Sequence, residues 1–196
     1  FGGVVYDLND QWSAYASYAE VFKPQAQKLK GPEGNSSAVE AMTGKTYETG
    51  IKGELFGGAL NLTTALFYTK REHEAMQDPA YPQAPFSYSG SCCFIGQGEV
   101  ISKGIDIEAT GEVLPGLEVI AGYTLNLMDN RTEESDYTSI TPKHLFKLWS
   151  VYTLPNEWSA WRLGGGVNIQ SSNYVKGTAY NFDAADNVIN EKPYDF

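Results

Sequence analysis

The chain has 196 residues, 42% of them hydrophobic, and a formal net charge of −10. It is therefore long enough and apolar enough to form one good-sized folded domain. No cluster of Lys or Arg stands out along it, which disfavours nucleic-acid binding, because that function needs a basic surface to displace counterions.

The amino-acid composition favours strands and tight turns. Aromatic residues make up 13% of the chain, and it contains 13 Tyr and 20 Gly. Flat and branched side chains fit a pleated surface, and glycine permits tight turns. No apolar run approaches the roughly 18 residues that a spanning helix needs. We therefore expect an all-β fold. A membrane β-barrel is not excluded, because its strands alternate between apolar and polar residues.

Alternation of side chains with a period of two predicts about eight strands, taken here in chain order. The pattern is clearest in the middle of the chain, where apolar residues occupy alternate positions in three segments. Each predicted strand has roughly the ten residues that a tilted membrane strand requires. The predicted strands are 1–8, 12–22, 46–55, 60–70, 104–112, 117–127, 144–154 and 161–170.

The predicted connections alternate between short and long. Short turns rich in Asn, Asp, Gly and Pro lie at 8–11, 56–58, 114–116 and 155–157; long polar connections lie at 23–43, 72–98, 129–141 and from 173 to the end. This order is typical of an up-and-down outer-membrane barrel with periplasmic turns and extracellular loops. Trp12, Trp158 and Trp161 follow short turns, where an aromatic girdle would meet the periplasmic lipid interface. Core tryptophans of a soluble β-domain are the alternative.

The polar positions of the alternating segments would share one face of the sheet. If the apolar stripes contact hydrocarbon, these polar side chains face a wet or protein-filled lumen, where charge is tolerated. A soluble sheet would place the same side chains in bulk water, and the sequence leaves both arrangements open. The residues concerned are Glu48, Lys52, Glu54, Asp106, Glu108, Arg162, Asn168 and Gln170.

The reactive side chains give no sign of catalysis or of a protein metal site. Cys92 and Cys93 are adjacent, and the two histidines, His73 and His144, lie far from each other in the sequence. Zinc sites need spaced Cys or His ligands, so zinc is not expected. A vicinal disulfide and a pair of free thiols both remain open. No GxSxG, HExxH or phosphate-loop motif is present, so we do not expect an enzyme.

Four segments resemble the TonB-dependent siderophore receptors, in particular the ferripyoverdine and ferric-hydroxamate type. They are YASYAEVFKPQ (15–25), YETGIKGELFGGALNLTTALFY (47–68), GIDIEATGEVLPGLEVIAGYT (104–124) and TPKHLFKLWSVYTLP (141–155). The resemblance implies a large outer-membrane β-barrel with a plugged lumen, described as 22-stranded. The chain, residues 1–196, would then be a single partial β-barrel domain, an antiparallel meander of about eight strands, from which the plug and the closing strands are absent.

The same resemblance implies a transport function in the outer membrane of a Gram-negative bacterium. The protein would bind a ferric siderophore and import it with energy from the TonB complex, which acts through a plug that this chain does not contain. The siderophore would carry the iron, so no cofactor is expected. A passive porin-like channel and a soluble β-rich ligand-binding module are the alternatives.

Ligand recognition is expected in the long connections, because rigid strands present loops for binding. Aromatic side chains there offer large contact area at low entropic cost, and Arg131 could balance an anionic complex. Packing of the loop aromatics among themselves is the alternative. The candidate ligand-binding residues are Tyr81, Phe86, Tyr88, Arg131, Tyr137, Tyr174, Tyr180 and Phe182.

Overall fold

A computed structural model of the chain describes residues 1–31, 37–81, 92–131, 141–172, 176–182 and 188–195. Within these ranges the protein is almost entirely β-sheet, and a single turn of 3-10 helix, η1 (Asn156–Trp158), is the one helical element. No helix in the described part of the chain is long and apolar enough to cross a membrane. The expectation of an all-β fold is confirmed.

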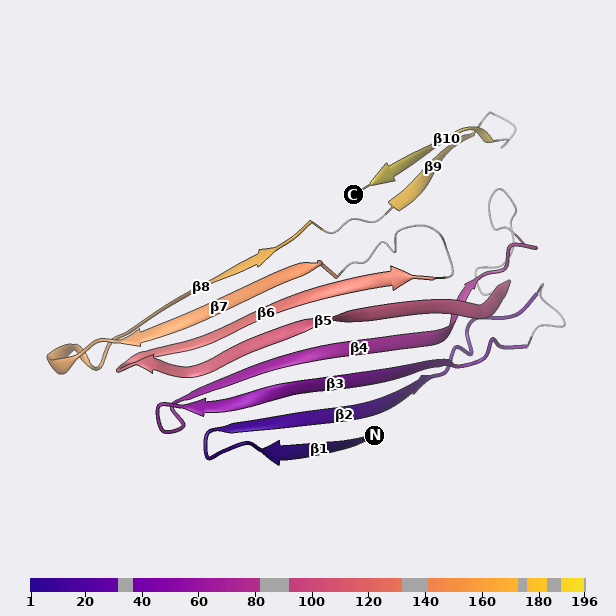
Figure 1. The fold of residues 1–196 in the computed structure, drawn as a ribbon. Coiled ribbons are helices and arrows are strands. Elements are labelled where there is room, and N and C mark those ends of the chain that lie inside the picture. The colour runs from indigo at the N-terminus through magenta and orange to yellow at the C-terminus, as the bar shows by residue number, and fades with distance from the viewer. Residues whose placement is uncertain (32–36, 82–91, 132–140, 173–175, 183–187, 196) are drawn as a thin grey trace.

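Eight strands form one antiparallel sheet in which sequence neighbours are also neighbours in space (Figure 1). This is the up-and-down meander that the sequence predicts, with the predicted number of strands. The strands are β1 (Gly2–Asp7), β2 (Trp12–Lys23), β3 (Met42–Leu55), β4 (Leu60–Gln77), β5 (Phe94–Leu114), β6 (Leu117–Asn130), β7 (His144–Thr153) and β8 (Arg162–Gln170).

The segment after Gln170 differs from the long loop predicted for it. It contains two further strands, β9 (Lys176–Phe182) and β10 (Val188–Asp195), which pair with each other in an antiparallel hairpin and not with the main sheet. The prediction was wrong because it depended on alternating apolar residues. A hairpin ladder is held by backbone hydrogen bonds, and these leave no such trace in the sequence.

The central strands are longer than predicted. β4 has 18 residues and β5 has 21, so the connection predicted at 72–98 is reduced to 78–93. The connections predicted at 23–43 and 129–141 become 24–41 and 131–143. The added part of β4 carries charged residues, among them Arg71, Glu72 and Glu74, and in the added part of β5 the apolar residues come in adjacent pairs, Phe94–Ile95 and Val100–Ile101. The hydrophobic alternation therefore fades there although the backbone pairing continues.

The short connections gather at one end of the sheet and the long ones at the other (Figure 1). In the first short turn, the Asn9 side-chain oxygen accepts hydrogen bonds from the backbone N–H groups of Gln11 and Trp12, both at 2.9 Å. In the second, Gly57 and Gly58 have φ values of 68° and 91°, which glycine adopts without steric cost. Local turn chemistry thus accounts for the tight end of the meander.

Strand register sorts the side chains onto two faces, as the alternation predicts. In one row of paired residues, Lys52 of β3 lies opposite Thr63 of β4, which lies opposite Glu108 of β5. We call this polar side the inner face. The pairings place all eight predicted lumen-facing polar residues on it.

The next row along the strands belongs to the opposite side, the outer face. There Ile51 of β3 pairs with Thr64 of β4, which pairs with Ile107 of β5. Large apolar side chains on this face are open to the surroundings: Leu66 is 53% exposed and Ile169 59% exposed. Such a continuous apolar surface is typical of a membrane strand's lipid side.

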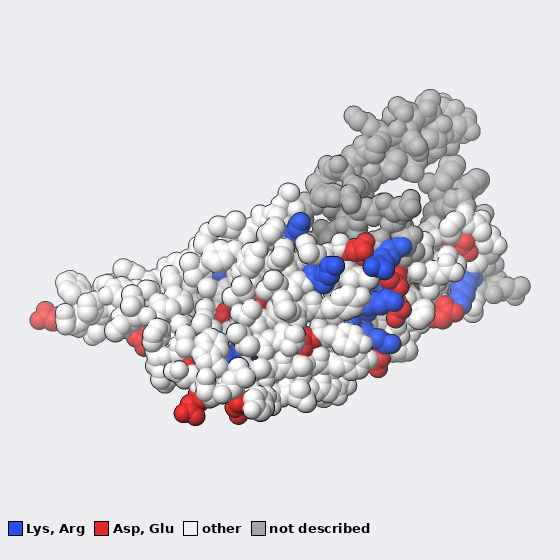
Figure 2. Space-filling model, viewed as in Figure 1, with Lys and Arg blue, Asp and Glu red and all other residues white. Residues whose placement is uncertain are grey.

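The apolar band of the outer face ends at a row of charges toward the long connections. On β3 and β4 the first charged outer-face residues are Lys45 and Lys70, which pair with each other across the strands. Just below them Tyr18, Tyr47 and Tyr68 form an aromatic row with ring centroids 5.1 and 6.5 Å apart. Lys and Arg side chains gather over this half of the visible face in Figure 2. The band is therefore about ten residues tall, the span of a membrane strand.

Two irregularities interrupt the β4–β5 ladder above this charged row. The register shifts between Arg71 and Glu74, where β4 has an extra residue, and again between Glu74 and Ala75, where β5 has one. His73 lies in the first bulge with φ of 61°, a left-handed conformation that is uncommon for residues other than glycine. Bulges of this kind bend and twist strands, here at the base of the long connections.

Candidate functional site

The best-packed part of the described chain lies where the β2–β3 connection folds onto the ends of β4 and β5. Val39 of this connection is 5% exposed, and Cys92 and Cys93, just before β5, are 1% and 0% exposed. Gly96 permits this packing, because a Cβ atom there would lie 2.9 Å from Val39 Cγ1. The long-connection end of the sheet therefore has a small core of its own.

The Gln25 side-chain amide joins the β2–β3 connection to the bulge of β4. Its Nε2 donates to the backbone oxygens of Glu40 and His73, both at 2.7 Å, and its Oε1 accepts from the Ala75 N–H at 2.9 Å. One side chain thus satisfies three backbone groups, one in the β2–β3 connection and two at the bulges of β4. Backbone groups of this kind are costly when unpaired.

Replacing Gln25 by Glu separates the two functions of the amide. A carboxylate can still accept from Ala75 N–H but cannot donate to the two carbonyls, so the β2–β3 connection should loosen while Ala75 stays protected. We expect a loss of roughly 1–3 kcal/mol of local stability. Hydrogen exchange should show faster exchange at Val39, whose N–H donates to the Lys28 carbonyl within this connection, and unchanged exchange at Ala75. Equal exchange at Val39 in both proteins would contradict this account, and Gln11→Glu in the first short turn is the control.

Charged side chains tie the same connection together. Lys30 forms an ion pair with Glu40, and this hydrogen bond holds the pKa of the Glu40 carboxyl below its usual value. The Lys28 ammonium lies 4.1 Å from the centre of the Phe94 ring, a cation–π contact with the first residue of β5. Because both groups of the ion pair are exposed to solvent, it contributes little to stability.

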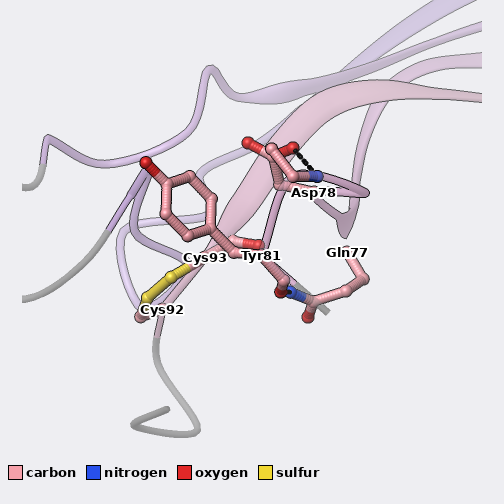
Figure 3. The surroundings of a disulfide bond; sticks show 6 residues. Gln77, Asp78, Tyr81, Cys92 and Cys93 are labelled. Carbon is pink, nitrogen blue, oxygen red and sulfur yellow. Dashed lines mark hydrogen bonds between the residues drawn. A yellow bond between two sulfur atoms is a disulfide. The ribbon is translucent and has the colours of Figure 1, made fainter. Parts of the chain in front are cut away.

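Cys92 and Cys93 form a vicinal disulfide, which decides between the two states that the sequence leaves open. The Cys93 carbonyl accepts hydrogen bonds from Asp78 N–H at 3.0 Å and from Gln77 Nε2 at 2.9 Å. Gln77 Nε2 also donates to the Tyr81 carbonyl at 2.7 Å. Figure 3 shows Tyr81, Gln77 and Asp78 around the disulfide. The disulfide is thus connected through hydrogen bonds to one of the candidate ligand residues.

The other candidate ligand residues lie apart from Tyr81 or outside the described residues. Arg131 follows β6, where its N–H donates to the Glu99 carbonyl of β5 at 3.0 Å and its Nε lies 3.4 Å from Asp129 Oδ2. Tyr180 and Phe182 belong to β9 and not to a loop. Phe86, Tyr88, Tyr137 and Tyr174 fall outside the described ranges. Ligand binding by all eight residues remains a prediction.

The inner face offers polar side chains and a hollow at its other end. Tyr15 donates its hydroxyl to Glu48 at 2.7 Å, and the Lys52 ammonium lies 5.0 Å from the centre of the same tyrosine ring. Near the short turns, a polar groove of about 590 Å³ is lined by residues of β1 to β4 and of the β1–β2 turn, among them Asp7, Asp10 and Glu54. In the described part of the chain, no group of three or more His, Cys, Asp or Glu could hold a metal ion.

Sequence patterns do not reveal the residues that build the small core at the long-connection end of the sheet. Gln25 and Gln77 act through side-chain contacts with backbone groups up to 50 residues away, and such contacts have no periodic signature. The tandem cysteines were the one available signal, since two thiols placed side by side are chemically conspicuous. The residues that surround the two cysteines can be identified only from the folded structure.

The meander, its alternating connections and its two faces agree with a match to a protein family. The model of the TonB-dependent receptor-like β-barrel matches residues 1–195, which is nearly the whole chain. The chain belongs to the TonB-dependent receptor β-barrel family. Relatives in this family are receptors and not enzymes.

Two similar proteins are ferric-pyoverdine receptors of Pseudomonas. A ferric-pyoverdine receptor of a Pseudomonas species is 38% identical over 180 residues, which cover 89% of this chain and 21% of the receptor. A ferric-pyoverdine receptor of Pseudomonas putida is 37% identical over 92% of this chain and 21% of the receptor. The chain therefore spans about a fifth of the length of the curated relatives it matches.

Solved structures show the same architecture. The ferripyoverdine receptor of the Pseudomonas aeruginosa outer membrane, solved with ferripyoverdine bound, matches with a TM-score of 0.74 at 28% identity and covers 98% of this chain and 24% of the receptor. The alcaligin outer-membrane receptor of Bordetella pertussis matches with a TM-score of 0.69 at 31% identity, covering 90% of this chain and 30% of the receptor. In both matches the chain corresponds to part of a larger protein.

Proposed function

We propose that the receptor containing this chain imports a ferric siderophore of the pyoverdine class across the outer membrane of a Gram-negative bacterium. Energy would come from the TonB complex, acting on a plug domain of the receptor. The iron would be cargo held by the siderophore and not by protein side chains. The chain itself would form part of the barrel wall and of the ligand-facing rim.

The observation that carries this proposal is the family match along residues 1–195. The relatives strengthen it, since four ferric-pyoverdine or ferripyoverdine receptors are 31–38% identical. A ferrichrome transporter and a catecholate siderophore receptor, both of Escherichia coli, are 29% and 30% identical. The identities of 38% and 37% to two of the pyoverdine receptors favour that class of siderophore.

The structure supports the placement in a membrane. The apolar band on the outer face and the charged row above it suit a lipid boundary, and the inner face carries the polar residues that a lumen tolerates. The long connections lie beyond the charged row. Ligand would thus be met at the end where Tyr81 and Arg131 lie.

The proposal is tested by tryptophan fluorescence of the full-length receptor in detergent, titrated with ferric pyoverdine, ferrichrome and a ferric catecholate. We expect saturable quenching of the fluorescence by ferric pyoverdine and weaker or no quenching by the other two ferric complexes. An iron-free siderophore that binds poorly without the metal should leave the fluorescence unchanged. A response to another chelate alone would reassign the siderophore class. No response to any ferric complex would refute the receptor function and favour a porin-like barrel.

A further inference from the structure

The residues around the disulfide form a junction between two long connections. Leu29 of the β2–β3 connection forms a β-bridge with Cys92 and accepts a hydrogen bond from Phe94 N–H at 2.8 Å. On the other side, Cys93 holds the turn that begins at Asp78. The three residues 92–94 are thus clamped between both connections. A change in the backbone of residues 92–94 would therefore alter both the β2–β3 and the β4–β5 connection.

The surrounding chain shields both cysteine side chains from solvent. Cys92 and Cys93 are the two most buried side chains in the described part of the chain, and protein interiors are close-packed. A disulfide holds two sulfur atoms at bonding distance, whereas two thiols must move apart to van der Waals contact. Reduction would therefore force the surrounding backbone to shift, as inserting extra volume into a packed core does.

Tyr81 depends on the position of this backbone. Its N–H donates to the Asp78 carbonyl at 2.9 Å, and its carbonyl accepts from Gln77 Nε2. Gln77 Nε2 and Asp78 N–H in turn both donate to the Cys93 carbonyl. Two hydrogen-bonded routes therefore lead from the disulfide to Tyr81.

We infer that the Cys92–Cys93 disulfide is a positioning element for ligand recognition: it holds Tyr81 and the β2–β3 connection in the conformation that receives the ferric siderophore. The ligand part of this inference rests on the proposed function. Pre-organising a binding surface lowers the entropy cost of association, so loss of the disulfide should weaken affinity without unfolding the barrel. The disulfide has no part in holding iron.

The experiment compares the full-length receptor in detergent before and after treatment with a small dithiol. The dithiol supplies two electrons and two protons, the S–S bond breaks to give two thiols, and the reagent closes to its own cyclic disulfide. Mass spectrometry of the alkylated peptide that contains Cys92 and Cys93 shows when reduction is complete. Hydrogen exchange at Asp78, Tyr81 and Phe94 is then measured beside the affinity for ferric pyoverdine.

Reduction should speed exchange at these three amides and raise the Kd for ferric pyoverdine about tenfold, and reoxidation should restore both. The Cys92→Ser/Cys93→Ser double variant should behave like the reduced protein and no longer respond to dithiol. Gln77→Met should weaken affinity while the disulfide stays intact. The control variant is Ser102→Ala, which removes a side-chain hydrogen bond to Asn126 further along β5 and should change neither readout.

Two results would overturn the inference. Unchanged exchange at all three amides after complete reduction would show that the disulfide does not hold this junction, whatever the ligand. Faster exchange with an unchanged Kd would show that the junction is held but does not matter for recognition. If the oxidised receptor binds no ferric chelate, the proposed function fails, the ligand part of the inference is overturned with it, and the exchange data still decide whether the disulfide anchors Tyr81.

Discussion

Thr64→Arg should destabilise the membrane-inserted receptor by about 2–4 kcal/mol, because a charge on the lipid face near the middle of the bilayer must be moved out of water. Thr64 lies on the outer face between Ile51 and Ile107, in the middle of the apolar band. Equilibrium unfolding from lipid bilayers measures the loss. The expected shift is large enough to lower the yield of folded receptor.

The matched control is Thr63→Arg, which makes the same chemical change one residue earlier. Thr63 lies on the inner face between Lys52 and Glu108, where the new guanidinium can meet a carboxylate and water. Its cost should be roughly 0.5 kcal/mol or less. Equal destabilisation by the two variants would contradict the assignment of the faces, and a larger loss for Thr63→Arg would reverse it.

Gly104→Ala should be the second strongly damaging change, although it adds a single methyl group. A Cβ atom on Gly104 would lie 2.7 Å from Phe67 Cζ and would collide with the Leu125 carbonyl oxygen. The backbone of β6 cannot retreat without losing ladder hydrogen bonds. We expect a loss of about 1–3 kcal/mol, measured by unfolding of the full-length receptor.

Gly122→Ala is the control for this substitution, since Gly122 also lies on the inner face and pairs with Glu108. A Cβ atom there would meet nothing within 4 Å, so the free energy of unfolding should change by roughly 0.5 kcal/mol or less. If both alanine variants unfold alike, close contact at Gly104 is not what requires glycine. The difference between the two variants is therefore the informative quantity.

The sequence predicted the membrane part of the sheet well, because one physical rule governs it. Where lipid covers one face, apolar residues must alternate, as Leu117, Val119 and Ala121 do, and the strand is visible in the sequence. From the charged row upward the pattern changes, and Lys70 pairs with Glu72 and Glu99 at 2.7 and 3.0 Å. Water covers that part of the strands, so polar residues are tolerated on the outer face. The strand then has no apolar alternation by which the sequence would reveal it.

The core at the long-connection end could not be predicted for a different reason. Gln25 and Cys92 act through partners that only the folded chain brings near them, and neither belongs to a repeating pattern. The sequence did indicate Tyr81 as a candidate, because it is an aromatic residue in a long connection. What it could not give is the disulfide near this residue and the two hydrogen-bonded routes that connect them.

The paired bulges above the membrane have a consequence for engineering chimeric receptors. Arg71 pairs with Val100 before the bulges and Ala75 with Gly96 after them, the same partners that an unbroken ladder would give. Each strand has nevertheless gained one residue, so odd and even positions have exchanged sides. A loop transplanted from a receptor without these bulges would keep every strand partner and still turn its recognition side chains toward the wrong side of the wall. In a loop graft, residue positions should therefore be aligned from the bulge at His73 and not from the membrane boundary.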